Sequence, residues 1–229
     1  MSAKSAIVSA VIGETKEGVW PMPKLAAQIN APIDEKTVAI VNAARKTFLS
    51  RGFDAASMDH IALTAGVSKR TVYNRFRSKE ELFGAAITET CQNLLPVNVD
   101  DIEASLEPYE LVLELSRQVV RGILQPEALS LRRIAAFEAE RTPAIGQAFL
   151  EHGPQWMVDK YAPIMERLAE KGVFEIADAR QAIWQLGALI TEPLHTMVLM
   201  GAGPENLEKA IDDQVNRGVA AFMKIYSRS

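Results

Sequence analysis

Cysteine is almost absent from this sequence of 229 residues, in which Cys91 stands alone. A single cysteine excludes an intramolecular disulfide and any zinc site that is built from several cysteines. It agrees with a reducing compartment, most simply a cytoplasm. Because a reactive thiol needs an electropositive and partly exposed setting, we expect Cys91 to serve helix packing instead.

Long hydrophobic runs are also missing. The apolar residues 7–12 are too few and too interrupted for the core of a secretory signal. The longest apolar stretch, AIWQLGALITEPLHTMVLM, includes Gln185, Glu192, Pro193 and His195. A membrane span needs about 20 mainly apolar residues, so we expect a buried helix there, no membrane association and a cytoplasmic location.

The usual groupings of catalytic and metal-binding residues are not found either. The three histidines lie far apart, and none belongs to an H-x-x-x-H pattern. Asp100–Asp101 and Asp212–Asp213 are adjacent pairs, whose side chains point to different sides of a helix or loop. We therefore expect no catalytic residue, no metal, no cofactor and no enzyme activity.

What the sequence does have is helical periodicity, with 48% hydrophobic residues and a formal net charge of -4. No run alternates with period two, so the predicted fold class is all-α. The piece GVWPMPK suggests an extended N-terminal arm over residues 1–33. Residues 34–83 are predicted to form a helix-turn-helix domain, and residues 84–229 a larger helical regulatory and dimerisation domain.

Local signals place the first helices. Ile40 and Phe48 repeat at helical spacing, and Ser57 is a good N-cap for a short second helix. Gly66 ends that helix, a third helix opens at Ser68, and the capping box S-K-E-E begins a fourth. Further helices are expected near 108–124, 127–140, 144–171, 179–201 and 204–226.

The two short helices joined by AGVS have the layout of a helix-turn-helix, in which the second helix enters the DNA major groove. Val72 and Phe76 share one face and are expected to reach the core, whereas Arg70 and Asn74 lie on the opposite face. Arg can bind guanine and Asn can bind adenine through two hydrogen bonds each. A charged run can also be a solvated helix face, but the turn, the core pair and the capping box together favour DNA.

Residues 37–87, TVAIVNAARKTFLSRGFDAASMDHIALTAGVSKRTVYNRFRSKEELFGAAI, closely resemble the DNA-binding domain of TetR-type bacterial regulators. The resemblance implies an N-terminal three-helix domain, a larger helical C-terminal domain and a homodimer. It implies base reading by Lys69, Arg70 and Thr71. It implies phosphate contacts from Tyr73, Asn74 and Lys79, with Ser57 at the start of the second helix. Ser68, which opens the third helix, is also a predicted DNA-binding residue.

The sequence departs from that family at three positions of the third helix. Arg70 stands where a small residue is common, Asn74 replaces a common His, and Arg75 replaces a common aromatic residue. The C-terminal stretch LRRIAAFEAERTPAIGQAFLEHGPQWM resembles the AefR-like or AcrR-like subgroup. That resemblance implies no particular ligand.

The C-terminal half suggests a pocket and a dimer surface. Large apolar side chains with a few polar tips, interrupted by prolines, are typical of small-molecule sites, although each residue alone could be ordinary core. The predicted ligand-binding residues are Phe137, Phe149, His152, Trp156, Met157, Tyr161, Met165 and Trp184. Segments 179–200 and 204–226 are apolar around more than one face, which predicts a homodimer or, alternatively, a fully internal helix of a monomer.

These features predict a dimeric regulator, most simply a repressor that a small hydrophobic effector releases from a palindromic operator in double-stranded DNA. One alternative is a DNA-binding regulator whose C-terminal domain only dimerises or binds a protein partner. Activation is another alternative, because the DNA-reading helix does not encode the sign of regulation.

Overall fold

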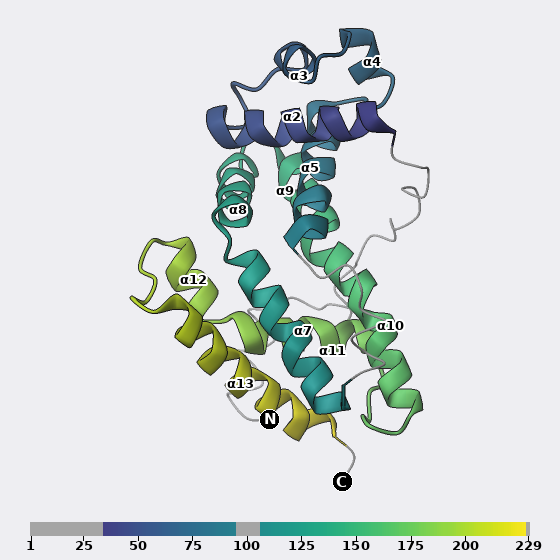
Figure 1. The fold of residues 1–229 in the computed structure, drawn as a ribbon, viewed down its shortest axis with the longest axis vertical. Coiled ribbons are helices and arrows are strands. Elements are labelled where there is room, and N and C mark those ends of the chain that lie inside the picture. The colour runs from purple at the N-terminus through teal and green to yellow at the C-terminus, as the bar shows by residue number, and fades with distance from the viewer. Residues whose placement is uncertain (1–33, 95–105, 228–229) are drawn as a thin grey trace, which may run out of the picture. The chain divides into compact units, whose positions relative to one another are not determined.

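The structure, a computed structural model, describes residues 34–94 and 106–227. The predicted arm over residues 1–33 lies outside the described residues. Within the described part the chain is helical and contains no strand, which confirms the all-α prediction. The first four helices in chain order are α2 (Glu35–Arg51), α3 (Met58–Thr64), α4 (Lys69–Tyr73) and α5 (Lys79–Leu94) (Figure 1).

The remaining helices belong to the C-terminal part of the chain. They are α7 (Pro108–Ile123), α8 (Pro126–Glu138), α9 (Pro143–Leu150), the π-helix η1 (Glu151–Gln155), α10 (Trp156–Glu170), α11 (Ala179–Thr191), α12 (Leu194–Leu199) and α13 (Leu207–Tyr226).

Two predicted helices are broken in the structure. The predicted helix 144–171 is interrupted by η1, a wider turn that contains Gly153 and Pro154 and connects α9 to α10. Proline lacks an amide donor, so it disturbs the regular α-helical hydrogen bonding. The predicted helix 179–201 ends at Thr191, and α12 begins after Pro193 for the same reason.

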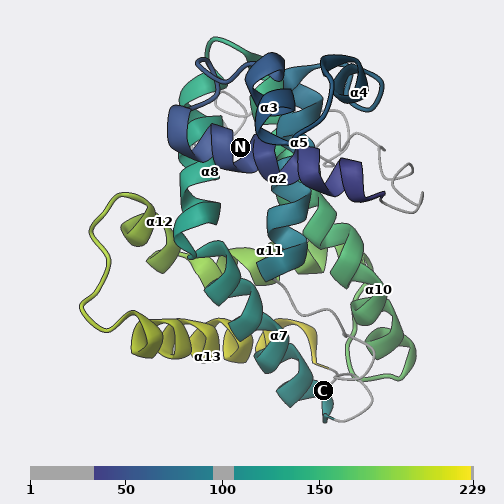
Figure 2. The same ribbon diagram turned by 45° about the horizontal axis from the view of Figure 1, so that its top comes forward.

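Two hydrophobic cores hold these helices together. One core joins α2, α3, α4 and α5 with residues of α8 and α9, and Phe48, Phe53 and Phe83 form an aromatic group inside it. The other core joins α7, α10, α11 and α13. In both views α3 and α4 lie on the side of α2 that faces away from α7 and α13 (Figures 1 and 2). We call α2, α3, α4 and the first half of α5 the N-terminal helical domain.

Cys91 lies on α5 against the first core. Burial raises the pKa of its thiol to about 11, so the thiol stays protonated near neutral pH. This setting agrees with the packing role that the sequence suggests for Cys91.

Candidate nucleic-acid interface and a cavity

The turn between α3 and α4 is fixed by backbone hydrogen bonds. The Gly66 amide donates to the Leu63 carbonyl at 3.2 Å, and the Val67 amide donates to the Ala62 carbonyl at 3.1 Å. This pair of bonds is a Schellman motif, which needs a left-handed residue after the helix. Gly66 supplies it with a φ of 68°. The glycine therefore sets the direction in which α4 leaves α3.

Serine hydroxyls cap both short helices. Ser57 Oγ accepts a hydrogen bond from the His60 amide at 3.2 Å, and Ser68 Oγ accepts one from the Thr71 amide at 3.1 Å. The hydroxyls of Ser68 and Thr71 are also 2.8 Å apart. Each side chain holds a helix start in place, and the exposed hydroxyls of Ser57 and Ser68 remain at the surface.

The helix α4 has one buried and one exposed face. Val72 is fully buried and Phe76, just after the helix, is 8% exposed, which confirms that both reach the core. Arg70 and Asn74 are exposed on the other side, and Tyr73 is 53% exposed beside them. The structure therefore presents these three side chains together at the surface, as a helix that reads bases must do.

The cations of this stretch differ in how they are held. Lys69 forms an ion pair with Asp59 of α3, in which both side chains are more than half exposed. Within the described residues, no side-chain hydrogen bond or ion pair holds the exposed guanidinium of Arg70. The Arg70 side chain is thus available for a contact outside the described residues. Lys69 can exchange the Asp59 carboxylate for a phosphate or a base.

Arg75 ties α4 to the start of α2. Its Nε donates to Thr37 Oγ1 at 3.0 Å, and its Nη2 forms an ion pair with the Asp34 carboxylate. Arg75 holds the pKa of Asp34 well below its usual range, chiefly through that hydrogen bond. Asp34 itself caps α2 by accepting from the Thr37 amide at 2.8 Å. The sequence marks Arg75 only as a departure from the family, and its role in positioning α4 appears in the structure.

Lys79 is engaged by the turn that connects α2 and α3. Its ammonium group donates to the carbonyls of Phe53 at 2.7 Å, Ala56 at 3.0 Å and Asp54 at 3.3 Å. It also lies 4.2 Å from the centre of the Phe53 ring. An ammonium group has three donors, so these carbonyls occupy them all. This placement joins α5 to the α2–α3 turn, whereas the resemblance implies a phosphate contact.

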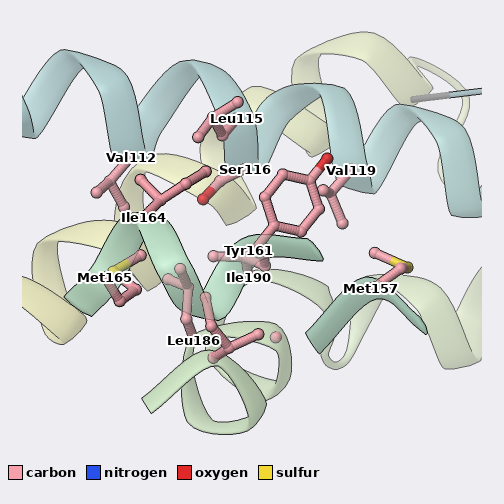
Figure 3. Close-up of a pocket in the computed structure, with 12 residues that line it drawn as sticks. Val112, Leu115, Ser116, Val119, Met157, Tyr161, Ile164, Met165, Leu186 and Ile190 are labelled. Atoms are coloured by element: carbon pink, nitrogen blue, oxygen red, sulfur yellow. The ribbon is translucent and has the colours of Figure 1, made fainter. Parts of the chain in front are cut away.

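A cavity of about 70 Å³ lies between α7, α10 and α11. Figure 3 shows the residues that surround it. Three of the predicted ligand-binding residues, Met157, Tyr161 and Met165, line it from α10. The side of the cavity formed by α7 includes Val112, Leu115, Ser116 and Val119, which are not among the ligand-binding residues predicted from the sequence.

The other five predicted ligand-binding residues do not line this cavity. Phe137 is 75% exposed on α8, and Trp184 is 38% exposed on α11. Phe149 packs against the first hydrophobic core, and His152 contacts α5. Trp156 packs against the edge of the C-terminal core and near Lys160. These five side chains are as large as those that line the cavity, but their positions on the helices direct them away from it.

Within the described residues, no cluster of three or more acidic, histidine or cysteine side chains could hold a metal ion. None of the described helices combines the length and the apolar character that a membrane crossing requires.

The capped α3, the glycine turn and the two-faced α4 define a helix-turn-helix, attached to a larger helical domain with a cavity. Sequence models agree with both parts. Residues 40–86 match the model described as bacterial regulatory proteins of the tetR family, and residues 110–228 match the AefR-like transcriptional repressor C-terminal domain. The second match alone covers more than half of the chain. The chain belongs to the TetR family, which confirms the resemblance seen in the sequence.

Individual relatives agree with this assignment. The flavonoid-responsive regulator FrrA is 32% identical, with a TM-score of 0.67 over 84% of this chain and 97% of that one. A TetR family regulator from Pseudomonas syringae pv. tomato is 28% identical, with a TM-score of 0.60 over 86% of this chain and 99% of that one.

The HTH-type transcriptional activator FasR of Mycolicibacterium smegmatis is 32% identical over 130 residues. That match covers 52% of this chain and 59% of FasR, so the chain spans less than two thirds of this relative. These relatives are described as transcriptional regulators rather than enzymes.

Proposed function

We propose that this protein is a homodimeric, sequence-specific DNA-binding regulator, acting as a repressor that a small hydrophobic effector releases from a palindromic operator. The exposed face of α4 carries the proposal, because Arg70, Asn74 and Tyr73 stand outward while Val72 anchors the helix. We propose base contacts for Lys69, Arg70 and Thr71.

The phosphate contacts are proposed for the side chains that flank this face. They come from Ser57, Ser68, Tyr73 and Asn74. Hydroxyl and amide groups of this kind commonly bind phosphate oxygens and fix the register of a protein on DNA. Because the partner is DNA, we place the protein in the cytoplasm of a bacterial cell.

The proposed dimer surface is formed by α11, α12 and α13, within segments 179–200 and 204–226. Trp184, Met197 and Ile225 expose 38%, 42% and 61% of their surface there. Exposed large apolar groups on neighbouring helices are typical of a protein interface. A two-fold dimer would present two copies of α4 to the two halves of a palindrome.

The sign of regulation has two candidates. The description of the C-terminal family as a repressor domain supports repression, which is our first choice. FasR, in contrast, is named a transcriptional activator, so activation is the second candidate. The same DNA-reading surface serves either sign, and the position of the operator relative to the promoter decides between them.

The test is the capture of sheared genomic DNA by the purified full-length protein, followed by sequencing. We expect enrichment of one short palindromic sequence beside a promoter, and its loss with the variant Arg70→Ala. A hydrophobic compound that releases the captured DNA would support the effector role. Uniform recovery of all fragments, with and without cell extract, would contradict sequence-specific binding.

A further inference from the structure

The walls of the cavity are almost entirely apolar. Of the twelve described residues that line it, Ser116 and Tyr161 carry the polar side-chain atoms, and none is charged. A charged ligand would lose its hydration there and find no opposite charge among these residues. The lining therefore favours an uncharged molecule.

The two hydroxyl groups lack hydrogen-bond partners within the described residues. Ser116 is 2% exposed and Tyr161 is 6% exposed, and both oxygens are inaccessible to solvent. Buried hydroxyls are normally satisfied, because an unpaired one costs free energy. Thr47 and Thr90 in this chain follow that rule, since each donates to the carbonyl four residues earlier, at 2.7 Å and 2.8 Å. Ser116, also within a helix, makes no such bond.

Both unpaired hydroxyls belong to the same cavity. Ser116 projects from α7, and the Tyr161 ring extends from α10 towards α7 (Figure 3). Burial raises the pKa of Tyr161 to about 12, so this hydroxyl remains a donor over the whole physiological range. The cavity thus offers hydrogen bonds to a guest that brings its own polar atom.

Gly187 of α11 gives the cavity additional room. A Cβ atom at this position would meet nothing within 4 Å. Glycine inside a helix is less favourable than alanine, and here no close contact demands it. The missing side chain leaves space in the wall opposite α7.

We infer that this cavity binds an uncharged, mainly hydrocarbon molecule with a carbonyl or hydroxyl oxygen, and that Ser116 and Tyr161 supply the hydrogen bonds to that oxygen. The inference rests on the proposed effector role of the C-terminal domain and names the chemical class of the effector. The described cavity, at about 70 Å³, is smaller than the roughly 150 Å³ that accommodates benzene in an apolar core. The flexible thioethers of Met157 and Met165 are the groups that a guest displaces first.

The experiment compares two probes of nearly equal shape, p-cresol and p-xylene, which differ by a hydroxyl in place of a methyl group. A third probe, p-toluate, adds a charge. Methyl-¹³C-methionine NMR of the full-length protein reports the site, because among the described methionines Met157 and Met165 line the cavity, whereas Met58, Met197, Met200 and Met223 do not. Dissociation constants are measured for the wild type, for Tyr161→Phe and for the double variant Ser116→Ala/Tyr161→Phe.

We expect p-cresol and p-xylene to shift the signals of Met157 and Met165, and p-toluate to leave them unchanged. The ratio of the p-cresol constant to the p-xylene constant should rise roughly three- to tenfold in the double variant, because a neutral hydrogen bond has that effect on affinity. Comparing ratios cancels the different hydration of the two probes. Thermal stability of the free protein should not fall, because the removed hydroxyls have no partner to lose.

An unchanged ratio in the double variant would overturn the inference, and so would probe-induced shifts that spare Met157 and Met165. The proposed function is tested separately by adding the same probes to the protein–operator complex. Binding that depends on Tyr161 without release of DNA would keep the inference and reject the effector role. Release of DNA, together with the same ratio of dissociation constants in the wild type and the double variant, would support the effector role and reject the inference.

Discussion

The contact between α5 and η1 predicts the effect of a single methyl group. Gly84 lies within α5, directly under the ring of His152 in η1. A Cβ atom on residue 84 would come within 2.5 Å of His152 Cδ2 and 2.7 Å of Nε2. The ring cannot simply turn away, because its Nδ1 lies 3.0 Å from Thr88 Oγ1 on the same helix. The variant Gly84→Ala must therefore move either the ring or η1.

The size of the effect follows from two opposed contributions. Alanine is favoured over glycine inside a helix by about 0.5–1 kcal/mol. Inserting a methyl group into a filled contact costs about 1–3 kcal/mol. We therefore expect Gly84→Ala to lower the free energy of unfolding by about 1–2 kcal/mol. For a chain of this length that lowers the unfolding midpoint by roughly 2–8 °C.

The assay is thermal unfolding followed by circular dichroism at fixed protein concentration. Gly187→Ala is the matched control, because it makes the same substitution within a helix where the new methyl group meets nothing within 4 Å. We expect this control to raise the midpoint. The pair Gly84→Ala and His152→Ala forms a double-mutant cycle, in which the second substitution should remove most of the cost of the first. A Gly84→Ala protein as stable as the control, or strictly additive effects, would refute the reasoning.

Three further substitutions have defined outcomes. Arg70→Ala should weaken specific binding by about 1–3 kcal/mol and relax the preference at one base pair, as measured by fluorescence anisotropy on an operator series; equal loss on all sequences would exclude base reading. Asp59→Asn should release Lys69 and tighten DNA binding about two- to fivefold at low salt, and unchanged affinity would show that the ion pair does not compete with DNA. Gly218→Ala should destabilise the protein by about 3 kcal/mol, because its Cβ would lie 2.5 Å from the Leu189 carbonyl oxygen; a wild-type unfolding midpoint would contradict that contact.

The N-terminal helical domain could be predicted from the sequence because its capping, turn and spacing signals are local. Ser57 and Ser68 cap the helices that follow them, and Gly66 has the left-handed conformation that the turn requires. The same holds for Val72, whose position four residues before Phe76 places both in the core. Each of these signals acts over a few residues, so the sequence alone contains the necessary information.

The cavity could be predicted only in part, because it depends on contacts between distant segments. The sequence predicts Met157, Tyr161 and Met165 as ligand-binding residues, and all three line the cavity. His152 is also a predicted ligand-binding residue, but it lies in the π-helical turn and contacts α5 instead. The sequence does not indicate Ser116, because an isolated serine within a helix gives no signal and its missing hydrogen bond appears only in the structure.

For Lys79, a cation of the basic stretch, the structure suggests a role other than the predicted phosphate contact. Its ammonium group is surrounded by the carbonyls of Phe53, Asp54 and Ala56, so it stabilises the turn before α3. We expect Lys79→Ala to lower the unfolding midpoint and to leave the salt dependence of binding to duplex DNA unchanged. Arg77, which is exposed just before α5, is the matched comparison, and Arg77→Ala should leave the unfolding midpoint unchanged. If Lys79→Ala instead reduces the slope by about one, Lys79 leaves its three carbonyls to contact a phosphate when DNA binds.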